Sequence, residues 1–204
     1  RAPLGALWRQ VLDGLRFVQR TAVLRTNVVL LTIGPLLLGS LHTLWIGFAW
    51  RVSHTETFGY GLTEMSNALG TLLGLWLLRP VLRRLNKGRV ILLGFLLMGC
   101  AVLAAGTTDS LPLVAVLAAV AGMGNMGFLV PSITLLQEQT PAELRGRAVA
   151  LRSMLTFGAF SVSNALAGNL SDVVGVSPLL VVLGGGMVLM ALLAWPIRSA
   201  REAH

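Results

Sequence analysis

The sequence predicts an all-α membrane protein with six membrane-spanning helices, and three observations lead to that fold class. Of the 204 residues, 55% are hydrophobic and only 12% are charged, whereas an ordinary soluble domain carries about 25% charged residues. The apolar residues form runs of roughly 20, the length that a helix needs to cross ~30 Å of hydrocarbon. The positive charges gather in alternate short loops between these runs.

Residues 1–25 predict an amphipathic helix that precedes the spans. Apolar residues recur there at three- and four-residue spacing, and charged residues such as Asp13, Arg16 and Arg20 lie between them. Such a helix lies in the membrane interface rather than across it. The sequence begins at Arg1 without a methionine, so we expect the chain to be a piece of a longer protein.

The six predicted spans form one transmembrane domain over residues 26–197, which is followed by a short tail at 198–204. The spans are 26–50, 58–78, 90–108, 111–136, 148–170 and 177–197. Each is long enough to cross a bilayer as a helix. The connectors between them are too short to form a separate soluble domain.

The positive charges predict the orientation of the spans. Fifteen of the sixteen Lys and Arg residues fall on one side of the predicted topology, and only Arg51 falls on the other. Positive residues in short loops are retained on the cytoplasmic side of a membrane, so both ends of the chain are predicted to be cytoplasmic. The net charge of +8 therefore belongs beside the lipid bilayer, and we expect no nucleic-acid partner.

Glycines are frequent within the predicted spans. Gly70 and Gly74 are four residues apart, and Gly122, Gly124 and Gly127 cluster in the fourth span. Such positions let the backbones of two helices approach closely, where lipid offers no hydrophobic drive for association. They are compatible with helix pairs that slide against one another and equally with the static packing of a bundle.

The sequence shows no apparatus for catalysis. It contains no Gly-Lys-Ser or Gly-Lys-Thr nucleotide loop and no serine in a nucleophile elbow. The three histidines, His42, His54 and His204, have no metal-binding spacing, and Cys100 is the only cysteine, which excludes an internal disulfide and a cysteine-based metal site. We therefore expect neither an enzyme nor a bound metal or cofactor.

Glu64 and His42 are the ionisable groups that lie deepest in the predicted spans. Glu64 lies six residues into the second span, about 9 Å below the outer surface, and His42 lies about 12 Å below it in the first. Ionisable groups at such depth usually mark an internal path, and a carboxyl beside an imidazole can exchange a proton near physiological pH. Our hypothesis is that Glu64, together with His42, carries a proton or receives a cationic group. The alternative is that Glu64 snorkels outward toward Arg51.

Other polar side chains in the spans have two interpretations. Asn67, Asn125 and Asn164 can hydrogen-bond either a substrate or a neighbouring helix. Arg152 lies one turn into the fifth span, where it can snorkel to the cytoplasmic surface or pair with Glu138 at the end of the fourth. We interpret Arg152 as a gate or an anchor rather than as a binding residue.

The segment 122–147 carries a resemblance to a known family. It reads Gly-Met-Gly-Asn-Met-Gly-Phe-Leu-Val-Pro-Ser and, further on, Leu-Leu-Gln-Glu-Gln-Thr-Pro-Ala-Glu-Leu-Arg-Gly-Arg. This resembles the tenth helix and the following cytoplasmic loop of major facilitator superfamily transporters, especially the exporter branch that includes enterobactin and macrolide efflux proteins. Residues 13–18 look like the end of the central linker of that branch.

The resemblance implies that the six spans are helices seven to twelve of a twelve-helix transporter. Arg145, Gly146 and Arg147 match the loop that bridges the cytoplasmic helix ends in that family. Residues 74–89 correspond to its other cytoplasmic loop motif but match it poorly. Leu78 stands where the motif has an acidic residue, which puts the usual charge relay of this loop in doubt for this half.

The resemblance also implies a function. A transporter of this kind exports a small organic molecule, such as a drug or a siderophore, in exchange for protons by alternating access, here in a bacterial inner membrane. The substrate site lies between two six-helix halves, so this chain would need an N-terminal half or a second copy of itself as partner. The alternative is a half-sized or truncated scaffold that does not transport, and a membrane enzyme ranks below both.

Overall fold

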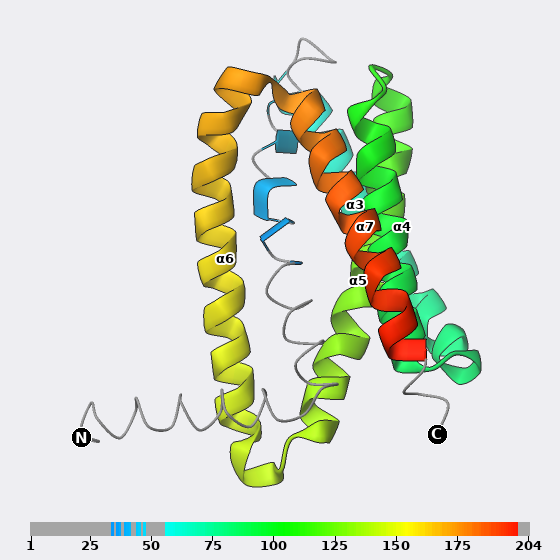
Figure 1. Ribbon diagram of the computed structural model, residues 1–204. Coiled ribbons are helices and arrows are strands. Elements are labelled where there is room, and N and C mark those ends of the chain that lie inside the picture. Colours follow the sequence, from blue (N-terminus) through cyan, green and yellow to red (C-terminus); the bar gives the residue numbers. More distant parts are fainter. Residues whose placement is uncertain are drawn as a thin grey trace, which may run out of the picture.

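The computed structural model describes residues 56–199 and, before them, residues 34, 36, 37, 39–41, 44, 45 and 47. The predicted interfacial helix at 1–25, the histidines His42, His54 and His204, and Arg51 lie outside the described residues. The helices carry the labels of Figure 1.

Five α-helices and one short 3-10 helix make up residues 56–199. They are α3 (Glu56–Arg84), α4 (Lys87–Gly106), α5 (Leu111–Gln139), η1 (Ala142–Leu144), α6 (Arg145–Val174) and α7 (Val176–Ser199). Figure 1 shows the α-helices as long rods that run up and down between two ends of a bundle. The described ranges contain no strand, so their fold is all-α.

Tight turns join the helices. α4 ends at Gly106, two residues before the predicted end of its span, where both the backbone N–H and the hydroxyl of Thr107 donate to the carbonyl of Ala104. α6 ends at Val174 and is capped by Gly175, whose φ of 87° lies in a region that favours glycine and whose N–H donates to the carbonyl of Ser171 at 3.0 Å. These caps let each chain segment reverse direction within a few residues.

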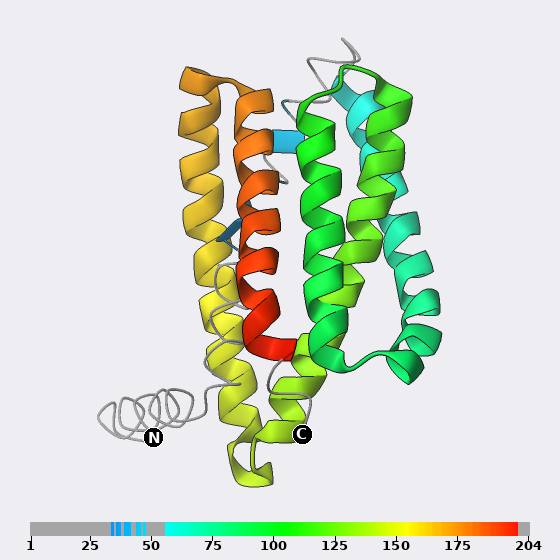
Figure 2. The same ribbon diagram turned by 45° about the vertical axis from the view of Figure 1, so that its right-hand side comes forward.

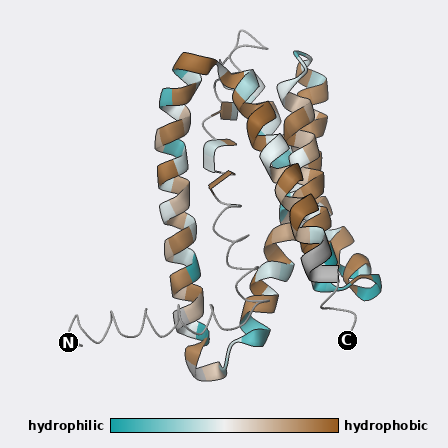
Figure 3. Cartoon of the chain, viewed as in Figure 1, coloured by the Kyte–Doolittle hydropathy of each residue, from teal (hydrophilic) through white to brown (hydrophobic). Residues whose placement is uncertain are grey.

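Four of the described helices are long and apolar enough to cross a membrane: the segment Thr57–Arg84 of α3, α4, α5, and the segment Val176–Trp195 of α7. α6 has 30 residues, which is about 45 Å, but hydrophilic residues interrupt its apolar run (Figure 3). These are Arg152, Ser153, Thr156, Ser161, Ser163, Asn164 and Asn169. The structure is that of a polytopic membrane protein, and the six spans predicted exceed these four because α6 is polar and residues 26–50 are mostly outside the description.

The core lies around α4. This helix packs against α5 on one side and α7 on another, and α3 packs against α5 (Figure 2). The rings of Phe95 on α4 and Phe128 on α5 are fully buried, with centroids 5.1 Å apart. Leu44 and Trp45, from the helical residues between 34 and 47, are buried in the same core.

Glycines line the contacts of these four helices. A Cβ atom on Gly70 of α3 would lie 1.9 Å from the carbonyl oxygen of Ala119 on α5. A Cβ on Gly184 of α7 would lie 2.4 Å from the amide nitrogen of Leu103 on α4. Since real Cβ atoms essentially never approach other atoms so closely, the close backbone approach predicted from the glycines is confirmed.

α6 is attached differently. It makes few contacts with α5 and α7 and is tied to the residues between 34 and 47 instead. The hydroxyl of Ser163 hydrogen-bonds the hydroxyl of Ser40 and donates to the carbonyl of Leu36. On the opposite side of α6, Met154 and Phe157 are exposed. α6 therefore has one packed side and one open side.

Candidate functional site

Glu64 is half-buried on α3. It lies eight residues after the start of the helix at Glu56, which is about 12 Å along the axis, and it is not a free carboxylate. The preceding residue, Thr63, donates its hydroxyl hydrogen to backbone carbonyls one turn earlier in the same helix. Because His42 lies outside the described residues, the predicted meeting of Glu64 and His42 stays a prediction.

The amide of Asn67 is used in helix packing. Its Nδ2 donates to the carbonyl of Ala118 at 3.2 Å, which joins α3 to α5. At the same contact, a Cβ on Gly122 would lie 2.3 Å from the carbonyl oxygen of Asn67. Glu64 is one turn away from Asn67 on the same side of α3. Asn67 therefore holds α3, the helix that carries Glu64, against α5.

The other two asparagines lie apart from Asn67. Asn125 is half-buried on α5, seven residues beyond Ala118 and thus about 10 Å further along the helix, and its side chain forms no hydrogen bond in the described part of the chain. Asn164 is half-buried on α6 and has a partner. Among the described residues, the Asn125 amide thus has no partner in helix packing, unlike that of Asn67.

The helix ends fall into a basic end and an opposite end. The basic end holds the turns between α3 and α4 and between α5 and α6 (Figure 1). Its exposed cations are Arg79, Arg83, Arg84, Arg89 and Arg145. Asp109 lies before α5 and Asp172 lies near the end of α6, at the opposite end. Charge is therefore segregated along the axis of the bundle.

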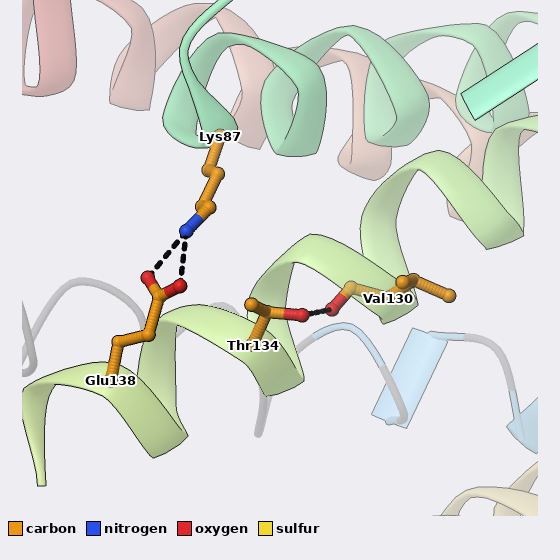
Figure 4. Close-up of polar contacts among 4 residues, drawn as sticks. All are labelled: Lys87, Val130, Thr134 and Glu138. Atoms are coloured by element: carbon orange, nitrogen blue, oxygen red, sulfur yellow. Dashed lines mark hydrogen bonds and ion pairs between the residues drawn. The ribbon is translucent and has the colours of Figure 1, made fainter. Parts of the chain in front are cut away.

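Glu138 pairs with Lys87 at the basic end (Figure 4). Both carboxylate oxygens of Glu138, near the end of α5, accept from the ammonium group of Lys87, the first residue of α4. In the described residues the partner of Glu138 is Lys87, so the alternative in which Arg152 pairs with Glu138 has no contact behind it. α4 begins beside the end of its antiparallel neighbour α5, whereas Arg152 lies two turns into α6, which has already left α5.

Arg145 joins α5 to α6. Its Nε donates to the carbonyl of Thr140 at 3.2 Å, and Thr140 is the residue that caps α5. The hydroxyl of Thr140 in turn donates to the carbonyl of Leu136 at 2.6 Å. Gly146 is exposed with open space around it, and the side chain of Arg147 is outside the description. Of these three loop residues, Arg145 is the one with a visible bridging contact.

Arg152 is half-buried, and its Nε is buried without a hydrogen-bond partner in the described part of the chain. Two further buried atoms share this property: Oγ1 of Thr156, one turn further along α6, and Oε1 of Gln139 at the end of α5. Sequence reasoning missed Thr156 and Lys87. The four-residue spacing from Arg152 would have indicated Thr156, and the facing ends of antiparallel neighbours would have indicated the pairing of Lys87 with Glu138.

Acidic, histidine and cysteine side chains do not cluster in the part of the chain that the structure describes. No group of three or more of them is placed to hold a metal ion within those residues. Cys100 is exposed on α4. The arrangement of the described polar groups is that of isolated charges and amides along apolar helices.

Comparison with known proteins identifies relatives for nearly the whole chain. The family model described as Major Facilitator Superfamily matches residues 26–204. The multidrug efflux pump Tap of Mycolicibacterium fortuitum is 27% identical over 193 residues, which cover 94% of this chain and 47% of the relative. The proteins of the same name from Mycobacterium bovis and Mycobacterium tuberculosis are 28% identical over 194 residues, covering 94% of this chain and 46% of each relative.

The chain spans about half the length of the curated relatives it matches. The family match, in contrast, covers far more than half of the chain itself. The chain is therefore a multi-pass membrane protein of the Major Facilitator Superfamily, a family of transporters and not of enzymes.

Proposed function

We propose that this chain is the C-terminal, six-helix half of a proton-coupled exporter of small organic molecules. The observation that carries the proposal is similarity along 94% of the chain to proteins named multidrug efflux pumps, of which it spans 47% or less. The six spans are residues 26–50 followed by α3 to α7, after the amphipathic linker helix at 1–25 and before the tail at 198–204. Export proceeds by alternating access, with the substrate held between this half and an N-terminal one.

The path of the chain supports α6 as a span despite its polar residues. α5 ends at the basic end, where Glu138 meets Lys87. α7 begins at the opposite end, since a Cβ on Gly106, the last residue of α4, would lie 3.0 Å from the carbonyl of Ser177. α6 must cover the distance between these ends, and its 30 residues suffice. Its polar side chains then face protein or a water-filled path rather than lipid.

The segregation of charge supports the orientation. Exposed arginines occupy the basic end, and Asp109 and Asp172 occupy the other. Because positive residues in short loops stay on the cytoplasmic side, the basic end faces the cytoplasm. Six spans then place both termini of the chain on that side, in the inner membrane of a bacterium. Arg145 and the ion pair of Lys87 with Glu138 lie at this cytoplasmic end, where they bridge neighbouring helix ends.

Glu64 carries the coupling proton in this proposal. It is the acidic side chain that lies furthest from the helix ends in the described residues, about 12 Å into α3. An ionisable group at such depth is costly unless it serves a path. Asn67 anchors the neighbouring turn of α3 to α5, so Glu64 is held at a fixed depth while it gains and loses a proton. Asn125, whose amide forms no hydrogen bond within the described residues, is a substrate contact.

The experiment measures export by the full natural gene product. Cells that express it are loaded with a panel of drugs and siderophores, and accumulation is compared with and without a proton uncoupler. We expect uncoupler-sensitive export by the natural protein. Glu64→Gln should abolish both export and its dependence on pH. Asp172→Asn is the matched control, because it removes an acidic group at an exposed helix end and should leave export unchanged.

Two results would contradict the proposal at different levels. If Glu64→Gln retained export and its pH dependence, Glu64 would not be the residue that carries the coupling proton. No export of any compound by the natural protein, correctly inserted, would favour the non-transporting scaffold instead.

A further inference from the structure

Arg152 and Thr156 place two unused hydrogen-bond donors on one side of α6. Nε of Arg152 and Oγ1 of Thr156 are both buried, and neither has a hydrogen-bond partner among the residues that the structure describes. The two residues are four apart, so their side chains are neighbours on the helix surface. A guanidinium group can only donate, and a hydroxyl can donate as well. Within the described residues the pair therefore lacks an acceptor.

Nothing described in the chain supplies this acceptor. The two nearest carboxylates by sequence are Glu143, whose side chain lies outside the description, and Glu138, which is occupied by Lys87. No other described carboxylate forms an ion pair with Arg152. A partly buried charge without a counter-ion is costly. A protein therefore retains such a charge where a ligand supplies the counter-ion.

The side of α6 that carries Arg152 faces the protein and not lipid. Ala159 and Ser163, which follow at seven and eleven residues, lie on this side and are buried. Ser163 contacts Ser40 there. Phe157 lies on the other side of the helix and is exposed. This direction argues against a guanidinium that snorkels among lipid headgroups.

We infer that Arg152 and Thr156 form a carboxylate-binding site, which selects substrates that carry a carboxylate group. Two donors on adjacent turns match the two oxygens of one carboxylate. The site lies seven residues from the start of α6 at Arg145, about 10 Å from the basic end. A substrate entering from that end meets it early. The inference rests on the proposed export function, because it names the class of compound that the exporter accepts.

Two dyes that differ by one carboxylate test the site. Rhodamine B has a free carboxyl group, and its ethyl ester does not. In the full natural gene product we expect export to favour rhodamine B. Arg152→Gln should lower export of rhodamine B about tenfold, the effect of losing one charge-assisted hydrogen bond, and leave export of the ester unchanged. Thr156→Val removes one donor at constant shape and should give a smaller loss of the same selectivity.

Binding provides a readout that does not depend on transport. In detergent, rhodamine B should raise the thermal midpoint of the natural protein, its ethyl ester should not, and the shift should vanish in Arg152→Gln. Arg79→Gln is the matched control, because it removes an exposed arginine at the same end. Selective binding without any export would uphold the site and refute the proposed function.

Two outcomes would overturn the inference. Equal export and equal binding of both dyes before and after Arg152→Gln would show that the guanidinium meets no carboxylate of the substrate. The second outcome is that a well-folded Arg152→Gln protein loses export of both dyes while binding stays intact. The guanidinium would then pair with a carboxylate of the protein itself and not of the substrate.

Discussion

α4 and α6 are both long helices of one bundle, yet their glycines do different things. A Cβ on Gly94 or Gly99 of α4 would collide with the backbone of α5 or the side chain of Met187 on α7. A Cβ on Gly158 or Gly168 of α6 would meet nothing within 4 Å. A glycine in a membrane helix thus permits a close approach without requiring one, and the neighbour decides which occurs.

The energetic basis of the two helices differs as well. In lipid, helices associate through close packing and polar contacts, because burial from water no longer drives them together. α4 is held by close packing against α5 and α7, whereas α6 makes few contacts with those helices and its described contacts lie with Leu36, Gly39 and Ser40 instead. Substitutions should therefore be severe in the packed unit of α3, α4, α5 and α7 and mild on the open side of α6.

The largest effect is expected for Gly70→Val. The new side chain would start 1.9 Å from the carbonyl oxygen of Ala119, and backbone cannot move aside as a flexible side chain can. We expect a loss of more than about 3 kcal/mol, seen as absence of a monodisperse peak in size-exclusion chromatography of the detergent-solubilised protein. Gly61→Val on the same helix, where the space is open, should elute like the natural protein. A normal elution profile for Gly70→Val would show that α3 and α5 are not in backbone contact.

Replacement of glycine by alanine should change the free energy of unfolding in opposite directions in α7 and α6. Gly184→Ala on α7 places a methyl group 2.4 Å from the amide nitrogen of Leu103 and should cost about 1 to 3 kcal/mol. Gly158→Ala on α6 meets open space and should stabilise the helix by about 0.5 to 1 kcal/mol. Unfolding by SDS titration of mixed micelles measures both. Destabilisation of similar size by both variants would mean that α6 is packed as tightly as α7.

The sequence predicted the helices well because their signal is local. Runs of apolar residues fix the length of a span, and charges mark the loops at its ends. The exact ends depended on caps, such as Thr107 at the end of α4, which composition does not reveal. The polar helix α6 shows the limit of a hydropathy argument, since the role of Ser163 is apparent only once its contacts with Leu36 and Ser40 are known.

The candidate site was harder to predict, because partners across helices are not encoded by spacing. The hydrogen bond of Asn67 to Ala118 and the ion pair of Glu138 with Lys87 both join residues 51 positions apart. Knowing that α5 packs between α3 and α4 is necessary before either can be drawn. The depth of Glu64, in contrast, follows from counting residues along one helix.

A moderate effect is expected for Asn67→Ala. The substitution removes the hydrogen bond that joins α3 to α5, and bonds of this kind in membrane proteins contribute about 0.6 kcal/mol on average. Asn125→Ala provides the comparison, since the Asn125 amide forms no hydrogen bond in the described residues. It should leave the free energy of unfolding unchanged and alter export instead. The same SDS titration separates the two, and an equal loss of stability in both would assign Asn125 to packing.

The smallest effect belongs to the ion pair of Lys87 and Glu138, although it is the most visible polar contact at the basic end. The two side chains are 37% and 53% exposed, and water and salt screen such pairs, so the coupling between them should be below about 1 kcal/mol. A double-mutant cycle of Lys87→Gln and Glu138→Gln measures it, and high salt should reduce it further. A coupling of several kcal/mol that salt does not weaken would mean that this end of α4 and α5 is shielded from water. The helix ends would then be held by charge, whereas the structure indicates that the glycine contacts above them hold the packed unit together.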